Sequence, residues 1–374
     1  MTESEQLLLD LIAIPSVNPA FLDDPTLTHE QRVADYLFGI ARRAKLDVEL
    51  VEVKPRRPNL IAKLAPSGKV NQRILMAPHF DTVGLVDPSQ LKPRRSAGRI
   101  QGRGACDTKG SVASMFSALL TMAKAKRLKN TELVFVGLID EENTQLGSRF
   151  FVSKKERADL AIVGEPTELK VITAHKGDIW LEFSTQGKAA HGAKPHLGKN
   201  AVHEMARIVH LLETLYQDTL AQRSHPLLGS PTINVGAIRG GTQANIVPDK
   251  CTMIADRRTI PGENLKSVRK ELATLLRNHG LKAEITDQKM ANCDPMETDC
   301  NNTFVRSFLD AMAQKKGLGA DYFCDAAILA GGGIPSVVFG PGSINQAHTV
   351  DEWISIRSLN DATASLVRFF SGLP

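Results

Sequence analysis

Five short segments place a histidine or an acidic residue after a run of apolar residues or a glycine-rich turn. In α/β folds such positions lie at the carboxyl edge of the sheet, where these folds build their sites. Imidazole nitrogens and carboxylate oxygens together suit Zn²⁺, or a related ion such as Co²⁺ or Mn²⁺. Each segment alone would fit a surface turn or helix cap, so the prediction depends on the whole set. The candidate metal ligands are His79, Asp107, Glu142, Glu165 and His348.

Acidic neighbours of these residues suggest further roles. Asp81 lies two residues after His79, so its carboxylate could accept the second N–H of a metal-bound ring. Glu141 directly precedes Glu142, and neighbouring side chains point in different directions. One of this pair could bind a metal while Glu141 acts as the general base. Asp107 could bridge two cations, and the alternative is that it caps the helix that follows. The glycine-rich turn before Asp107 does not match the glycine patterns of phosphate-binding loops or of dehydrogenases.

Alternating strand and helix patterns must position these residues. Apolar residues at 3.6-residue spacing predict helices, and alternating or β-branched runs predict strands. Strands that alternate with helices indicate an α/β sheet. The predicted helices cover residues 3–14, 29–45 and 110–125, and the predicted strands cover 48–53, 59–64, 73–77, 132–139 and 336–339.

A second pattern begins after Gly177. Residues 178–287 predict the order β-α-β-β-α-β, which is that of a ferredoxin-like module. We therefore expect one domain from residues 1–176 and 289–374, with residues 177–288 inserted as a second domain. The exposed sheet edge or helix face of such an insert needs covering, which suggests a homodimer.

The composition sets further limits. The chain has 374 residues, which exceeds the roughly 250–300 that one core usually serves. Its net charge of +5 is small and spread out, so no nucleic-acid partner is expected. No segment has the ~20 apolar residues of a membrane helix, and the N-terminus does not read as a signal peptide. Five widely spaced cysteines suggest reduced thiols in the cytoplasm, with a Cys293–Cys300 bridge as the alternative.

The five segments, in this order, resemble one family across almost the whole chain. It is the di-zinc amidohydrolase and peptidase family of acetylornithine deacetylase, succinyl-diaminopimelate desuccinylase, aminoacylase and glutamate carboxypeptidase. The resemblance implies a zinc-peptidase-like catalytic domain, with a mixed central sheet flanked by helices, and an inserted ferredoxin-like lid and dimerisation domain. It assigns His79 and Glu165 to one metal, Glu142 and His348 to the other, Asp107 to the bridge, Glu141 to the base, and Asp81 to orienting His79.

The insert also carries motifs that resemble the family's lid. His191 lies in the segment Lys188–Gly192, and Asn245 lies in the segment Gly240–Asp249. Arg258 follows Asp256 and Arg257. In relatives, the matching histidine reaches the partner subunit's site, and the matching asparagine and arginine hold the substrate carboxylate. A guanidinium fork suits that role. The alternative for His191 is a hinge histidine that packs against Pro195.

The resemblance implies hydrolysis of the amide bond of an N-acyl amino acid or dipeptide. Residues 347–353 and 164–167 look closest to the acetylornithine deacetylase and carboxypeptidase branches. Desuccinylation and dipeptide cleavage stay open, and a non-catalytic binding module would require a lost ligand or base, which is not seen. The sequence departs from the family at Pro78, at Cys324–Asp325, and at the basic segment 91–95, which replaces a Trp and a Pro-Phe pair.

Overall fold

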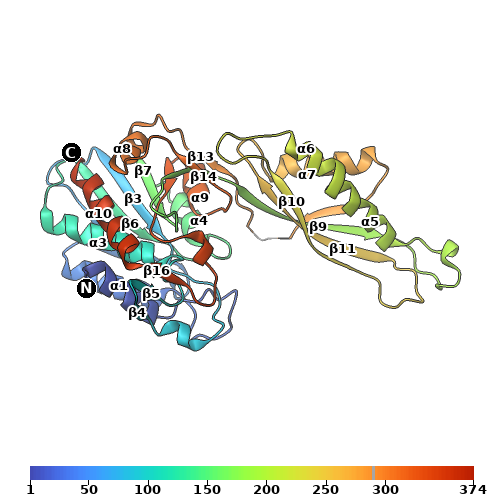
Figure 1. Cartoon of the computed structure of the whole chain (residues 1–374), viewed down its shortest axis with the longest axis horizontal. Helices are drawn as coiled ribbons and strands as arrows, with labels where there is room; N and C mark the ends of the chain where they lie inside the picture. Colours follow the sequence, from blue (N-terminus) through green and yellow to red (C-terminus); the bar gives the residue numbers. More distant parts are fainter. Residues whose placement is uncertain (289–290) are drawn as a thin grey trace. The chain divides into compact units, whose positions relative to one another are not determined.

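A computed structural model describes residues 1–288 and 291–374 (Figure 1). The chain forms two compact units. Unit 1 contains residues 1–173, 298–318 and 324–374, and unit 2 contains residues 174–297 and 319–323. The expected domain boundary at residue 289 lies outside the described residues.

A mixed sheet has the strand order β1-β2-β6-β3-β7-β15-β8-β13, and β14 also pairs with β8; its strands β1, β2, β3, β6, β7 and β15 form the centre of unit 1. The four central strands β6, β3, β7 and β15 are parallel, whereas β2 is antiparallel to β6 and β1 is antiparallel to β2. This arrangement confirms the predicted fold class. The strands are β1 (Asp47–Lys54), β2 (Arg57–Leu64), β3 (Gln72–Pro78), β6 (Thr131–Gly137), β7 (Leu160–Gly164), β8 (Ile172–His175), β13 (Met296–Glu297), β14 (Leu318–Ala320) and β15 (Ser336–Val338).

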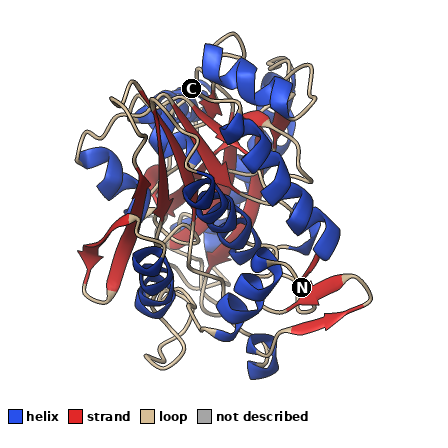
Figure 2. Cartoon of the chain, turned by 90° about the vertical axis from the view of Figure 1, so that its left-hand side faces the viewer, coloured by secondary structure: helices blue, strands red, loops and turns tan. Residues whose placement is uncertain are grey.

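Helices flank this sheet (Figure 2). Every residue of β6 and of β7 is buried, as expected for parallel strands whose two faces are both covered. Helix α3 packs on β3 and β6, and α1 and α10 pack on α3, while α2 packs on β1 and β2. The helices are α1 (Glu3–Ala13), α2 (Gln31–Arg43), α3 (Lys109–Ala125), α4 (Leu146–Ser153), α8 (Thr303–Ala311), α9 (Ala326–Gly331) and α10 (Ile356–Ser371), with short 3₁₀ turns η1 (Pro88–Leu91) and η4 (Ile344–Gln346).

Close packing fixes the end of β6 against the loop after β3. The ring of Phe80 lies over Gly137, where an added Cβ would stand 1.8 Å from the ring carbon Cζ. Phe80 also stacks near Phe135, and Phe116 meets Phe135 edge-on. The glycine therefore permits an aromatic residue to fill the core directly beside His79.

The basic segment that departs from the family pattern forms part of a small sheet, with strand order β16-β5-β4. Its strands are β4 (Arg94–Ser96), β5 (Arg99–Gln101) and β16 (Trp353–Ser355). Arg95 pairs with Glu5, and the guanidinium of Arg99 lies 3.7 Å from the ring centroid of Trp353. This segment is therefore tied to the N-terminal helix and to the strand that follows His348.

Unit 2 has a four-stranded sheet with order β10-β11-β9-β12, in which all neighbours are antiparallel. This is the predicted ferredoxin-like arrangement. The first helix of this unit is followed directly by a π-helical turn and a further helix, which ends at Ala221. The elements are β9 (Gly177–Gln186), η2 (Pro195–Leu197), α5 (Ala201–Leu211), η3 (Leu212–Tyr216), α6 (Gln217–Ala221), β10 (Thr232–Gly240), β11 (Lys250–Thr259), α7 (Leu265–Asn278) and β12 (Glu284–Asp287).

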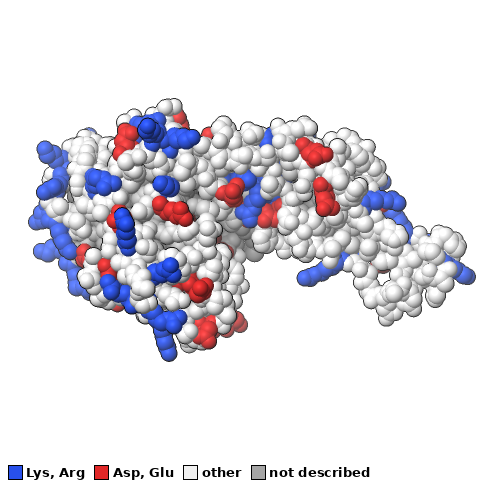
Figure 3. Space-filling view, viewed as in Figure 1, with Lys and Arg blue, Asp and Glu red and all other residues white. Residues whose placement is uncertain are grey.

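Among residues 1–288 and 291–374, no helix is both long and apolar enough to cross a membrane. None of the five cysteines, all of which lie among the described residues, forms a disulfide, so Cys293 and Cys300 are not bridged. On the face of unit 1 that Figure 3 shows, charges of both signs are interspersed, with lysine and arginine gathered along its left edge.

Candidate metal centre

The parallel strands of unit 1 bring the five predicted ligands together. His79 follows β3, Glu165 follows β7, and the loop that carries Glu142 follows β6. Because these strands are parallel neighbours, their carboxyl ends meet at one edge of the sheet. Asp107 precedes α3, and His348 comes from the long loop after β15.

The donor atoms form two groups. His79 Nε2 lies 3.2 Å from Asp107 Oδ1 and 3.8 Å from Glu165 Oε1. His348 Nε2 lies 3.1 Å from Glu142 Oε2 and 3.3 Å from Asp107 Oδ2. The two oxygens of Asp107 thus face different histidines, which is the arrangement that a carboxylate shared between two cations requires.

The chemistry of these residues fits divalent cations. Glu142 Oε1 and Glu165 Oε1 are buried and have no hydrogen-bond partner among the residues the structure describes. Burial, and then the charge of Asp107, raises the pKa of Glu142 to about 7. Burial also raises the pKa of Glu165 well above its usual value. A cluster of buried, mutually repelling carboxylates beside two imidazoles is what bound cations would stabilise.

Glu141 lies beside the first group, and its carboxylate could also reach a cation held there. Its Oε2 is 4.0 Å from His79 Nε2, which is farther than either Asp107 or Glu165. Burial, and then the charge of Glu165, raises the pKa of Glu141 well above its usual value.

Asp81 contacts more than the histidine that it was expected to orient. His79 Nδ1 lies 3.0 Å from the backbone oxygen of Asp81 and 3.5 Å from its carboxylate Oδ1. The same carboxylate accepts the backbone N–H groups of Glu141 and Glu142, each at 3.1 Å. Asp81 therefore ties the loop after β3 to the loop after β6.

Glu352 is a residue whose role was missed from the sequence. Its buried carboxylate accepts backbone N–H groups from Gly104, Cys106 and Asp107 at 2.8–2.9 Å. It also pairs with Arg103 at 2.9 Å. Glu352 thus fixes the loop that presents Asp107, whose peptide bond to the next residue is cis. Its position four residues after His348 was the only signal in the sequence.

Asp325 is a second residue whose position was not anticipated. It accepts a hydrogen bond from Ser148, and burial raises its pKa to about 7. Its Oδ2 is buried without a hydrogen-bond partner among the described residues. The negative charge of Asp325 helps to raise the pKa of both Glu141 and Glu165, so Asp325 contributes to the electrostatics of the centre.

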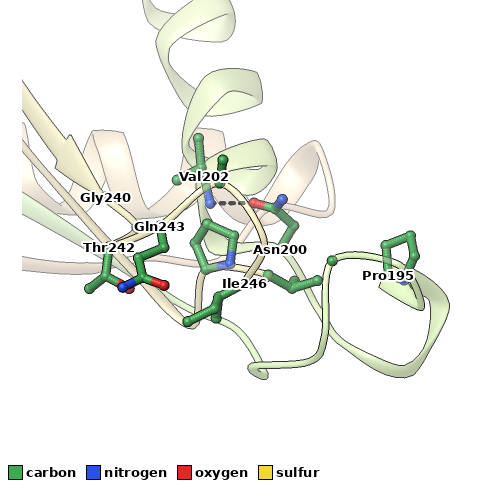
Figure 4. A pocket seen from close by; sticks show the side chains of 12 residues that line it. Pro195, Asn200, Val202, Gly240, Thr242, Gln243 and Ile246 are labelled. Carbon is green, nitrogen blue, oxygen red and sulfur yellow. Dashed lines mark hydrogen bonds between the residues drawn. The ribbon is translucent and has the colours of Figure 1, made fainter.

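In unit 2, the structure brings His191 and Asn245 together. The backbone of His191 pairs with Ile246, and Gly192 donates its N–H to the carbonyl of Asn245 at 2.7 Å. Both residues are exposed, and their chain neighbours Gly192, Ala244 and Ile246 line a hollow of about 510 Å³ together with Gly240, Thr242 and Pro195 (Figure 4).

Arg258 lies elsewhere in unit 2. It pairs with Asp256 at 3.0 Å and Asp178 at 3.7 Å, and its guanidinium lies over the ring of Phe323. Strand β11 begins at Lys250, near the Asn245 loop, and Arg258 lies eight residues further along it. At a rise of about 3.3 Å per residue, this separates Arg258 from that loop by roughly 25 Å.

Comparisons with family models and with curated proteins relate this chain to peptidases and to acetylornithine deacetylases. Residues 173–284 match the model of a peptidase dimerisation domain, and residues 59–195 match that of peptidase family M28. The chain is 31% identical to an acetylornithine deacetylase of Vibrio atlanticus over 349 residues, covering 89% of both chains. It is also 31% identical to one of Aliivibrio fischeri, over 86% of this chain and 85% of that one.

Solved structures share the fold. An aminopeptidase of Bacillus cereus superposes with a TM-score of 0.80 at 20% identity, covering 99% of this chain and 97% of that one. An M20 family metallo-carboxypeptidase of Sulfolobus solfataricus superposes with a TM-score of 0.79 at 18% identity, covering 99% of both. The chain therefore belongs to the M20 family of metal-dependent peptidases and deacylases, and it is an enzyme that acts on linear amides.

Proposed function

We propose that this enzyme hydrolyses the amide bond of an N-acyl amino acid, with N-acetylornithine as the first candidate. The observation that carries the proposal is Asp107, whose two oxygens face the histidines of two separate donor groups. The named acetylornithine deacetylases at 31% identity support the choice of an N-acetyl substrate. Desuccinylation and dipeptide cleavage are the competing activities.

The residues present would hold two zinc ions, or cobalt or manganese in their place. His79 and Glu165 would bind one ion, Glu142 and His348 would bind the other, and Asp107 would be shared. Ions bound there would polarise the substrate carbonyl and make water a better nucleophile near neutral pH.

Glu141 would act as the general base and then as the general acid. In this role it takes a proton from the attacking water and gives it to the leaving amine nitrogen. The backbone contacts to Asp81 hold the position of Glu141 for both transfers. Asp81 would also orient the ring of His79.

Unit 2 would serve as the lid and dimerisation domain of a homodimer. His191 would stabilise the negative oxygen that develops on the carbonyl, and Asn245 and Arg258 would hold the substrate carboxylate. Because Arg258 is roughly 25 Å of strand away from the His191–Asn245 loops, a single unit 2 would not bring all three to one centre. Two copies of the chain would supply them.

The free cysteines support a location in a reducing compartment, and we propose the cytoplasm. Buried thiols such as Cys106 and Cys324 lie close in sequence to residues of the centre, and burial raises the pKa of both. They would remain as protonated, unreactive thiols.

The test is a kinetic comparison of substrates on metal-loaded enzyme, with Glu141→Gln as the matched variant. We expect the highest kcat/KM for N-acetyl amino acids, above N-succinyl and dipeptide substrates. Glu141→Gln should keep its metal and lose about 10²–10⁴-fold in kcat. A higher kcat/KM for N-succinyl compounds or dipeptides would contradict the proposed N-acetyl substrate. An unchanged kcat in Glu141→Gln would contradict the role of Glu141 as the general base.

A further inference from the structure

A buried network of polar side chains lies beside the Glu141–Glu142 loop in unit 1. Its members lie far apart in the sequence, and each is at most 7% exposed. Four of them are charged, and burying charges is costly unless they are paired and hydrogen-bonded. The network consists of Asn18, Glu30, Arg57, Asp81 and Asp140.

Asn18 joins the two carboxylates that flank this loop. Its side-chain nitrogen donates to Asp81 Oδ2 at 2.8 Å and to Asp140 Oδ1 at 3.0 Å. Its own position is fixed, because its backbone N–H donates to Thr82 at 2.9 Å and its side-chain oxygen accepts from Ala20 at 3.0 Å. The amide supplies two donors where two acidic side chains would otherwise repel each other.

Arg57 holds the other side of the same loop. Its Nη2 donates to Asp140 Oδ1 at 2.8 Å, and its Nε and Nη2 form a two-point contact with Glu30 at 2.8 and 2.6 Å. Asp140 has a φ of +66°, a left-handed backbone conformation that is uncommon for residues other than glycine. The contacts to Asn18 and Arg57 stabilise this conformation, which sets the direction in which the next two residues leave the strand.

We propose that Asn18 and Arg57 are positioning residues for Glu141 and Glu142. Asp81 accepts the backbone N–H groups of these glutamates, and Asn18 and Arg57 fix the positions of Asp81 and Asp140. A shift of about 1 Å at a reacting group can cost about 100-fold in rate. The inference rests on the proposed role of Glu141 as the base.

The main test uses Asn18→Ala and Arg57→Lys, each compared with wild type after metal loading. Arg57→Lys keeps the charge but loses the two-point contact. We expect kcat per metal-loaded chain to fall about 100-fold in Asn18→Ala and less in Arg57→Lys, with KM nearly unchanged. The matched control is Thr131→Val, at the opposite end of β6, which removes two partly buried hydrogen bonds and should lower only the unfolding temperature.

A double variant separates positioning from general loss of stability. If Asn18 acts through Glu141, then adding Asn18→Ala to Glu141→Gln should reduce kcat little further, because residues that act as a unit are non-additive. If the fold-losses in kcat of the two single variants multiply in the double variant, the proposal is overturned. A wild-type kcat in Asn18→Ala would also overturn it. If Asn18→Ala does not fold, Arg57→Lys provides the same comparison. Full activity of Glu141→Gln would instead reject the proposed base itself.

Discussion

At the scale of single residues, the centre depends on side chains that hold the ligand-bearing loops. Glu352 holds the backbone of the loop from which Asp107 presents its two oxygens to two different histidines. Partners of this kind are expected to affect metal affinity about 10–100-fold even though they never touch the ion.

Glu352→Gln should therefore weaken both stability and metal binding. The substitution removes the charge that pairs with buried Arg103 and replaces one acceptor oxygen with a donor. Removing one partner of a buried ion pair typically costs about 3–5 kcal/mol. Denaturant unfolding and metal titration would measure the two effects.

The control is Glu156→Gln, which removes the exposed partner of Arg73. Surface pairs contribute about 0–1 kcal/mol, so this change should leave stability and metal affinity close to wild type. Equal effects of the two substitutions would contradict the role assigned to Glu352.

At the scale of elements, the contact between β6 and the loop after β3 sets the position of His79. In Gly137→Ala, the new methyl group would meet the Phe80 ring, and either the ring or the strand must move. Overpacking of this kind costs about 1–3 kcal/mol or more. We expect a lower unfolding temperature together with reduced metal affinity.

Gly331→Ala, at the end of α9, is the matched control. Within the described part of the chain, no atom other than those of its chain neighbours and the backbone of its own helix lies within 4 Å of an added Cβ at this position. The substitution should be neutral or slightly stabilising. Equal unfolding temperatures for Gly137→Ala and wild type would show that the aromatic contact does not constrain the loop.

The element β8 carries a histidine that gives a pH-dependent contribution to stability. His175 is fully buried, its Nδ1 lies 2.8 Å from the backbone oxygen of Lys176, and its Nε2 has no hydrogen-bond partner in residues 1–288 and 291–374. Burial lowers its pKa to about 4 from an ordinary value of 6.5. The neutral ring is therefore favoured in the folded state.

The stabilising contribution is present above pH 6.5 and is lost as the pH falls towards 4. Between pH 7.5 and pH 5, wild type should lose about 2 kcal/mol from this residue alone. The side chain of His175→Gln does not titrate. Between pH 7.5 and pH 5, the free energy of unfolding of this variant, measured in urea, should therefore fall by about 2 kcal/mol less than that of wild type. Parallel pH profiles for the two proteins would show that the ring titrates normally.

The sequence predicted the main strands and helices of unit 1 and indicated five candidate ligands, because both depend on local patterns; the structure brings the side chains of those five residues together. Apolar strands ended at His79 and Glu165, and parallel strands place their carboxyl ends together. It did not predict the partners that hold these residues. The contact of Asn18 with Asp81 spans 63 residues, and that of Asp107 with Glu352 spans 245, so both arise only from the tertiary fold.

At the scale of the whole molecule, the separation of Arg258 from the His191–Asn245 loops has a direct consequence in the proposed dimer. A heterodimer of one Glu141→Gln chain and one His191→Ala chain should contain one intact site. That site combines Glu141 of the second chain with His191 of the first.

We expect the doubly tagged and purified heterodimer to show about half of the wild-type activity, because one of its two equivalent sites is complete. Each parent homodimer should be nearly inactive. Heterodimers as inactive as both parents would mean that each chain uses its own His191. Sedimentation of the same samples would show whether they are dimers.

The central claim is that two cations, held by donor groups that share Asp107, are required for amide hydrolysis. Its most direct test is to strip the enzyme with a chelator and add back zinc in measured equivalents while following hydrolysis of an N-acetyl amino acid. We expect no activity without metal and full recovery by about two equivalents per chain, with Asp107→Ala failing to recover. Full hydrolysis by the stripped enzyme, or by Asp107→Ala, would contradict the claim.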